Sequence, residues 1–344
     1  MKKVRIGIIG AGKIAERLHL PGYREVVEAE VVAICDLQKD KADRLAGMFN
    51  IPAVYTDYKK MIKEAGIDAV SVCTPNYLHA EMSIFAANNK KNVLVEKPMS
   101  ISILAMKKMI AAAKKNKVLL MVEQSQRFDA AHQALKEIVD SGVLGKFISV
   151  RGKIGHAGPE NWSDNSPWFF EKKLSGGGVS VDVGIHILDL IRYITGRDVK
   201  SVAATMSNLV KKQYKLEDSV EAVLNFKDGT MGVFSTSWCT NPYEQTVTVY
   251  GHKGRATVFH GGTEGGKRLS AWTVDLKNPY GGNTEVKVAI PEKAKTGGPI
   301  QHFVNCCNGT ATCISDGTSG MKSMAVMLAA FKSAKTKKFE KIIV

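Results

Sequence analysis

The sequence lacks a run of apolar residues long enough to cross a membrane, which takes about 20 residues. Its first residues, MKKVRIGIIGAG, place two lysines before an apolar run, as a signal peptide does. That run is only about six residues long and contains glycine, whereas a secretory segment needs roughly seven to fifteen apolar residues. We therefore expect a buried strand here, and neither a signal peptide nor a membrane-bound protein.

Acidic residues are the scarcer charge, with 33 Asp and Glu against 48 Lys and Arg and a formal net charge of +15. A basic excess can mark a nucleic-acid-binding protein. The lysines of this chain are scattered, without interleaved aromatic residues, a dense basic stripe or a helix-turn-helix pattern. We predict a solvated surface and no nucleic-acid partner, and the positive field favours anionic ligands such as a dinucleotide.

Cysteine is also scarce, with six residues in 344, which favours a reducing compartment and a cytoplasmic location. Cys35 and Cys73 close apolar, strand-like runs, where cysteine behaves as a small core residue. Cys306, Cys307 and Cys313 occur in CCNGTATC, and this spacing matches no common zinc pattern. We expect a reduced helix-to-loop segment there and no metal site.

The chain length and its 44% hydrophobic content suggest two domains. Residues 4–123 alternate short apolar strands with amphipathic helices, which predicts a doubly wound parallel sheet with ligands at the carboxyl ends of its strands. Residues 200–260 contain strand-like runs separated by turns such as KDGT and GHKG, as in an antiparallel meander. The prediction is an α/β protein with a nucleotide-binding domain at 1–123 and an α+β domain with a mostly antiparallel sheet at 124–344.

The first predicted strand runs into a loop that opens a helix, GAGKIA at residues 10–15. The first glycine of such a loop permits a tight turn, the second lets the backbone approach a pyrophosphate, and the alanine keeps helix and strand close. The amides at the helix start then face the phosphates. We assign cofactor binding to Gly10, Gly12, Lys13, Ile14 and Ala15. The alternative is an ordinary strand-turn-helix.

Asp36 ends the second predicted strand, where an acidic residue accepts hydrogen bonds from the adenosine ribose. A carboxylate repels a 2′-phosphate, so NAD is favoured as the cofactor. Lys39 and Lys41 lie nearby and leave NADP possible. Two further loops follow predicted strands and point to the same edge of the sheet. Their candidate cofactor residues are Thr74, Pro75, Asn76, His79, Glu96 and Lys97.

The stretch GGGVSVDVGIHILDL carries Asp182 and His186 inside an otherwise apolar segment. A packed core excludes lone charges, so these residues are either partnered or catalytic. Helical spacing places residues 182, 186 and 189 on one face, where Asp182 and Asp189 could flank His186. An imidazole can act as a general base near neutral pH, and a lysine can stabilise developing negative charge or be the rival base, so His186 and Lys97 are candidate catalytic residues. The alternative is a buried Asp–His pair that only packs.

Four motifs, IGIIGAGKIA, CTPNYLHAE, VEKPMS and GGGVSVDVGIHILDL, together resemble the glucose–fructose oxidoreductase / inositol dehydrogenase / rhizopine catabolism (Gfo/Idh/MocA) family, essentially from end to end. The resemblance implies an N-terminal Rossmann domain and a C-terminal α/β domain built on a large open sheet. It implies an NAD(P)-dependent oxidoreductase that acts on a secondary alcohol or ketone of a sugar, sugar derivative or inositol. It also implies a homodimer or homotetramer formed through the sheet face.

The same resemblance implies roles for single residues. Lys97 matches the Glu-Lys-Pro lysine beside the nicotinamide, and Asp182 and His186 match a second-domain Asp-x-x-x-His pair in which the histidine acts as acid/base. The segment EQSQRF resembles one that often carries asparagine, so the contacts of its polar residues stay open. The remaining implied residues, with contacts to cofactor or substrate, are Gln124, Gln126, Arg127 (or a structural role), His156, Trp162 and Trp168.

Three other functions compete with a dehydrogenase. Some proteins similar to the family keep NAD bound and cleave glycosidic bonds through transient oxidation. A non-catalytic dinucleotide sensor or DNA-associated protein would explain the basic charge, but the sequence shows no helix-turn-helix or other nucleic-acid-binding motif. A metal site would use Asp182, His186 and His156, of which the first two have the i, i+4 spacing of helical ligands. We expect no metal in the active site.

Overall fold

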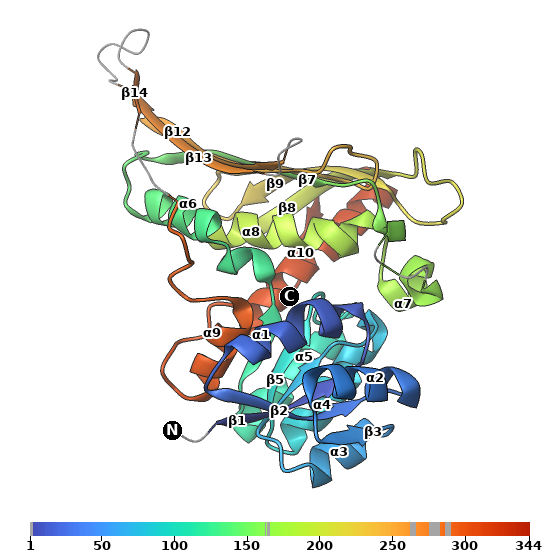
Figure 1. Cartoon of the computed structure of the whole chain (residues 1–344). Coiled ribbons are helices and arrows are strands. Elements are labelled where there is room, and N and C mark those ends of the chain that lie inside the picture. The colour runs from blue at the N-terminus through green and yellow to red at the C-terminus, as the bar shows by residue number, and fades with distance from the viewer. Residues whose placement is uncertain (1–2, 162, 164–165, 262–265, 275–282, 286–289) are drawn as a thin grey trace. The chain divides into compact units, whose positions relative to one another are not determined.

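The computed structural model describes residues 3–161, 163, 166–261, 266–274, 283–285 and 290–344 (Figure 1). The chain forms two compact units, which we call unit 1 and unit 2. Unit 1 consists of Met1–Gln124, Lys173–Gly176 and Thr296–Met321. Unit 2 consists of Ser125–Lys172, Gly177–Lys295 and Lys322–Val344.

Unit 1 is built on a six-stranded sheet in the order β3-β2-β1-β4-β5-β6, with every described pair parallel. This is the order of a doubly wound nucleotide-binding sheet, so the predicted fold class of this part is confirmed. The strands β2 and β3 lie on one side of β1, and β4, β5 and β6 lie on its other side. Ligands bind such sheets at the point between β1 and β4 where the order switches. The strands are β1 Val4–Ile9, β2 Ala29–Cys35, β3 Ala53–Tyr55, β4 Ala69–Val72, β5 Asn92–Glu96 and β6 Leu120–Glu123.

Helices flank this sheet, and several of them begin and end where the sequence supplies a cap (Figure 1). Asp57 accepts a hydrogen bond from the Lys59 amide at the start of α3, and Ser102 accepts one from Ala105 at the start of α5. The helices are the π-helix η1 Ala15–His19, α1 Leu20–Glu25, α2 Lys39–Phe49, α3 Tyr58–Glu64, η2 Asn76–Leu78, α4 His79–Asn88, α5 Ile103–Asn116 and α9 Pro299–Cys307.

Unit 2 contains a nine-stranded sheet in the order β14-β13-β12-β11-β7-β10-β9-β8-β15 among the described residues. Its pairs are antiparallel except β7 with β10, which confirms the mostly antiparallel sheet that the turns predicted. The strands are β7 Phe147–Gly155, β8 Val199–Ser207, β9 Ser219–Phe226, β10 Met231–Ser237, β11 Glu244–Gly251, β12 Gly254–Gly261, β13 Lys267–Val274, β14 Asn283–Glu285 and β15 Glu340–Lys341.

The central helix α8, Ile185–Thr195, lies along one face of this sheet (Figure 1). Gly152 of β7 allows the close approach, because a Cβ there would come within 2.8 Å of Ile187 and Ile191. Both isoleucines are fully buried, so the helix contributes to the core of unit 2. The other helices of unit 2 are η3 Ser125–Phe128, α6 Ala130–Asp140, η4 Pro159–Asn161, η5 Pro167–Phe170 and the π-helix η6 Ser180–Gly184, while α7 Lys172–Ser175 and α10 Gly317–Thr336 each contain residues of both units.

The helical stretch Lys172–Thr195 is long and apolar enough to cross a membrane by length and composition. The sequence did not suggest this, because polar residues interrupt the apolar run. Of its most apolar window, 78% is buried inside the protein, as expected for a core helix.

Candidate active site

The two glycines of the loop after β1 differ in backbone conformation and in the space around them. Gly10 adopts a φ of +100°, and a Cβ at this position would lie 2.7 Å from the carbonyl oxygen of Cys73. Only glycine fits such a turn. A Cβ at Gly12 would meet no atom of the described residues within 4 Å, beyond its chain neighbours and its own helix. The space beside Gly12 and the helix start that follows fit the phosphates of a dinucleotide.

Asp36 lies half-buried beside this loop, directly after β2. One carboxylate oxygen accepts a hydrogen bond from the amide of Ala11 at 2.8 Å, and the other accepts one from Gln38 at 2.8 Å. These bonds fix the carboxylate next to the glycine turn and leave lone pairs for ribose hydroxyls. The Lys39 ammonium pairs with Asp43 at 2.6 Å, so its charge is already matched within α2.

His79 joins the loops that follow β4 and β5. Its side chain is fully buried, with Nδ1 2.8 Å from the Pro98 carbonyl oxygen and Nε2 2.7 Å from that of Thr74. Burial lowers the pKa of His79 although both carbonyls favour the charged ring. The neutral ring carries one N–H and donates to one carbonyl at a time. His79 therefore holds the backbone beside Lys97, rather than offering its ring to a cofactor.

Glu96, the last residue of β5, anchors the backbone of Lys97. One oxygen of this buried carboxylate lies 2.9 Å from Nε2 of the fully buried His19, and the other accepts the amide of Lys97 at 3.1 Å. Burial alone raises the pKa of Glu96, but the hydrogen bond and charge of His19 and the charge of Lys97 outweigh it, so the pKa is lowered. Glu96 is therefore a charged group that fixes its neighbour.

In unit 2, Asp182 lies in the π-helix η6 and is only 7% exposed. Short π-helical segments often occur at functional sites. An Asp182 oxygen accepts a hydrogen bond from the indole nitrogen of Trp238 at 2.9 Å and lies 3.6 Å from Nε2 of His156. His156 Nδ1 accepts the Gly158 amide at 2.9 Å, which leaves the neutral ring's proton on Nε2, facing Asp182.

His186 is half-buried at the start of α8, directly after this π-helix. Asp189, expected on the same face, is engaged elsewhere: its two oxygens accept from Nε and Nη2 of Arg127, both at 2.6 Å. Ser323 donates to Asp189 at 2.7 Å. Because Arg127 is 3% exposed, this ion pair supports the structural role that the sequence left open for it.

The remaining predicted residues occupy varied positions. The Gln126 side chain accepts a hydrogen bond from Gln245 at 2.8 Å, and Asn76 donates to the Ser175 carbonyl at 2.7 Å. Trp168 is half-buried, with its ring edge-on to Phe169. Trp162 lies outside the described residues. Thr74, Pro75 and Lys13 are half-buried, Ile14 is exposed, and Ala15 and Gln124 are buried.

The sequence did not indicate two residues that contact site carboxylates: Trp238, which contacts Asp182, and His19, which contacts Glu96. Trp238 directly follows β10 and lies far from Asp182 in sequence, so no local pattern links the two residues. His19 lies in η1, and a lone histidine on an apolar helix face gives no sign of its partner. Neither contact follows from local spacing, because both bridge elements that only the fold brings together.

The fold and the loop after β1 indicate a dinucleotide-binding protein, and comparisons with known proteins identify its family. Residues 4–124 match the oxidoreductase family with an NAD-binding Rossmann fold, and residues 132–257 match the GFO/IDH/MocA C-terminal domain. A myo-inositol 2-dehydrogenase of Thermotoga maritima is 32% identical over 256 residues, 73% of this chain and 74% of that protein. The chain belongs to the Gfo/Idh/MocA family.

Two further similarities extend over the whole chain. A D-glucoside 3-dehydrogenase of Escherichia coli is 29% identical, with 97% of this chain and 96% of that protein covered. The crystal structure of an aldose–aldose oxidoreductase from Caulobacter crescentus, complexed with glycerol, superposes with a TM-score of 0.85 at 25% identity. That similarity covers 99% of this chain and 100% of the other. The protein is an NAD(P)-dependent sugar or polyol dehydrogenase, and NAD is the cofactor that its Rossmann domain supports.

Proposed function

We propose that this dehydrogenase transfers a hydride between NAD and a ring secondary alcohol of a sugar, sugar derivative or inositol. The observation that carries the proposal is the position of Lys97, at the carboxyl end of β5 with its amide fixed by Glu96 and the adjacent Pro98 carbonyl fixed by His79. The D-glucoside and myo-inositol dehydrogenases named above act on cyclic polyols, which supports this substrate class and favours a dehydrogenase over a glycoside-cleaving enzyme.

NAD supplies the hydride acceptor when bound. The Lys97 ammonium donates a hydrogen bond to the reacting oxygen and stabilises the charge that develops there. His186 takes the hydroxyl proton, since an imidazole can act as a general base near neutral pH. Asp182, held by Trp238 and facing His156, orients substrate hydroxyls and the neighbouring imidazole. Lys97 is the alternative base.

The other assignments extend this proposal. Residues 1–123 bind the nucleotide, and residues 124–344 bind substrate and form a homodimer or homotetramer in the cytoplasm. Asp36 favours NAD, and NADP is the second cofactor to test. The cofactor contacts are Gly10, Gly12, Lys13, Ile14, Ala15, Asp36, Thr74, Pro75, Asn76, Glu96, Lys97, Gln124 and Trp168. The substrate contacts are Lys97, Gln126, His156, Trp162, Asp182 and His186.

The test is NADH formation over a panel of inositols, glucosides, free sugars and uronic acids, with NAD and NADP in parallel. With the best substrate, Lys97→Ala should lower kcat by about 10²-fold or more, because the charge on oxygen loses its stabilising cation. Lys107→Ala, at an exposed lysine of α5, is the matched control and should behave like the wild type. His186→Asn should lower kcat by about 10²- to 10⁴-fold. It should also remove the fall of kcat at acidic pH that a protonated base causes in the wild type. No NADH with any substrate would contradict the proposal.

A further inference from the structure

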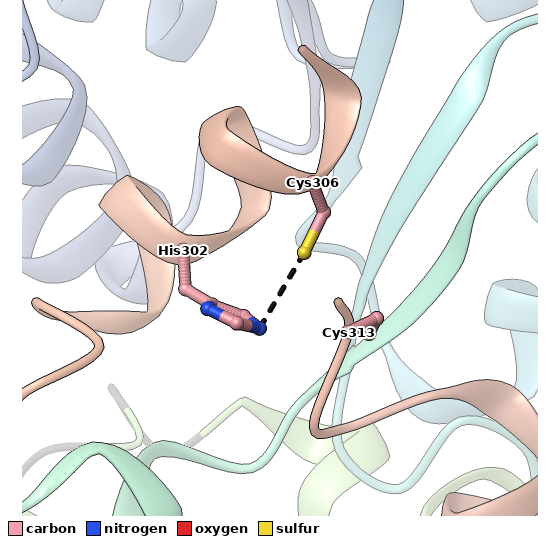
Figure 2. A group of neighbouring side chains, drawn as sticks. All are labelled: His302, Cys306 and Cys313. Carbon is pink, nitrogen blue, oxygen red and sulfur yellow. Dashed lines mark hydrogen bonds between the residues drawn. The ribbon is translucent and has the colours of Figure 1, made fainter. Parts of the chain in front are cut away.

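A second cluster of reactive side chains lies in unit 1, and the dehydrogenase reaction does not use it. His302 and Cys306 project from α9, and Cys313 approaches them from the segment after the helix (Figure 2). One ligand atom from each residue lies within 4.8 Å of the other two. The imidazole Nε2 and the Cys306 sulfur are 3.4 Å apart. We propose that these three side chains bind a Zn²⁺ ion.

The donor set and its spacing suit zinc. Thiolate and imidazole are the ligands that Zn²⁺ prefers in proteins, at about 2.3 Å for sulfur and 2.0–2.1 Å for nitrogen. Tetrahedral bonds of those lengths place ligand atoms about 3.5–3.8 Å apart. The His302–Cys306 pair, at 3.4 Å, is close to this separation, and the Cys313 sulfur needs to move by no more than about 1.3 Å. Three protein ligands leave the fourth position to water.

The backbone holds the three ligands in place without a metal. His302 and Cys306 are four residues apart on one helix, so they share a face. The Asn305 carbonyl accepts from both the amide and the hydroxyl of Thr310, which turns the chain back toward the helix. Beyond Cys313, the Ile314 amide donates to Nε2 of His302 at 3.2 Å.

That last hydrogen bond also sets the form of the imidazole. A nitrogen that accepts an amide hydrogen carries a lone pair, so Nε2 of His302 is in the form that binds metal. A zinc ion at Nε2 would displace the Ile314 amide. Its neighbour Ser315 remains bound to β6 through the Val122 amide and carbonyl, at 2.8 and 2.6 Å. Zinc would therefore cross-link α9 to the segment that borders β6, and stabilise unit 1.

The sequence could not indicate this site from CCNGTATC alone, because the nearest neighbour of Cys306, Cys307, is not in the cluster and His302 lies outside the motif. Cys307 instead belongs to the packed side of α9, where burial raises the pKa of its thiol to about 12. It provides a matched control: a cysteine on the same helix, adjacent in sequence, outside the proposed ligand set.

The test uses the full chain, reduced and without an affinity tag. Metal analysis should find about one Zn²⁺ per chain, and Co²⁺ added to the apoprotein should give the absorption of a tetrahedral thiolate complex. Competition with a chromophoric chelator should show that Cys306→Ser, Cys313→Ser and His302→Asn each weaken Zn²⁺ binding by more than about 100-fold. Cys307→Ala should bind as the wild type does. Zinc should raise Tm of the wild type and not of Cys306→Ser.

Two outcomes would overturn the proposal: reduced apoprotein that takes up neither metal, or a loss of affinity in Cys307→Ala equal to that of the ligand variants. NAD binding by each variant reports on its folding. The Co²⁺ spectrum of the wild-type protein keeps the test decisive even where a variant does not fold.

Discussion

Two helices of this protein begin in the same way, with a glycine-rich segment followed by a π-helical turn. In unit 1, Gly10 and Gly12 precede η1, and in unit 2, Gly177 and Gly178 precede η6. The second glycine of one segment and that of the other have opposite surroundings. The space beside Gly12 is open to a ligand, whereas a Cβ at Gly178 would lie 2.2 Å from the Glu217 carbonyl oxygen. The same sequence signature serves ligand approach in one unit and close protein packing in the other.

The π-helical turns also differ in what they bury. η1 presents His19 to the Glu96 carboxylate inside unit 1. η6 presents Asp182 to the Trp238 indole and to His156, which is partly exposed. Glu96 is therefore enclosed and positions the backbone of Lys97, while Asp182 remains within reach of a group that meets solvent. A buried carboxylate is a structural group in the first case and a candidate for substrate binding in the second.

The largest effect on stability should come from the enclosed pair. His19→Ala leaves the Glu96 charge buried without its main partner and should lower the free energy of unfolding by about 3–5 kcal/mol at pH 7, measured with urea. Because the pKa of Glu96 is lowered in the folded protein, its contribution is present above its ordinary value of 4.5 and is lost as the pH falls through the folded value.

The difference between wild type and His19→Ala should therefore shrink as the pH falls below 4.5. Glu96→Gln, which keeps an acceptor for His19 and does not titrate, is the control. A difference that stays constant from neutral pH to pH 3 would show that the pair contributes no charge interaction.

The next effect concerns the packing of the second glycine segment. Gly178→Ala forces a methyl group against the Glu217 backbone and should cost about 1–3 kcal/mol. Gly47→Ala, at a helical glycine of α2 with open space around its Cβ among the described residues, should be stabilising by up to about 1 kcal/mol. Thermal unfolding of both variants measures these changes in stability. Equal stability of the two variants would remove the packing explanation for the second segment.

A conservative change tests the indole contact of Asp182. Trp238→Phe keeps a ring and removes the N–H that donates to the carboxylate, and should cost about 1–2 kcal/mol of stability. With the substrate identified, it should also lower kcat, because Asp182 loses its fixed orientation. Trp272→Phe, at an exposed position in β13, should change neither quantity. An unchanged kcat in Trp238→Phe would restrict Asp182 to a packing role.

The smallest effect on stability should be that of Gly12→Ala. Since the added methyl meets no described neighbour, unfolding should shift by less than about 0.5 kcal/mol. The NAD dissociation constant, from calorimetry, should nevertheless rise about tenfold, which is about 1.4 kcal/mol, because the methyl enters the space assigned to the pyrophosphate. Unchanged NAD affinity would move the cofactor away from this loop.

Local patterns predicted the parts of the fold that local physics controls. The alternation of apolar strands and amphipathic helices indicated the parallel sheet of unit 1, and the turns between later strands indicated the antiparallel sheet of unit 2. The GAGKIA loop and Asp36 could be proposed together as a dinucleotide site because such a site is built from residues close in sequence, and the fold does place the Asp36 carboxylate against this loop. By contrast, helical spacing suggested Asp189 as a neighbour of His186, and the fold uses it to neutralise Arg127.

By itself, the sequence determined the class of each sheet, and it also supplied the proposals for the cofactor loop and for the acid, base and lysine, since these depend on periodicity, glycine and residue type. Only the tertiary structure decided which buried groups are partners: His19 with Glu96, Trp238 with Asp182, and His302 with two cysteines. The reason is physical. A buried polar group must find a donor or acceptor wherever the chain packs, and packing joins positions whose separation in sequence carries no signal.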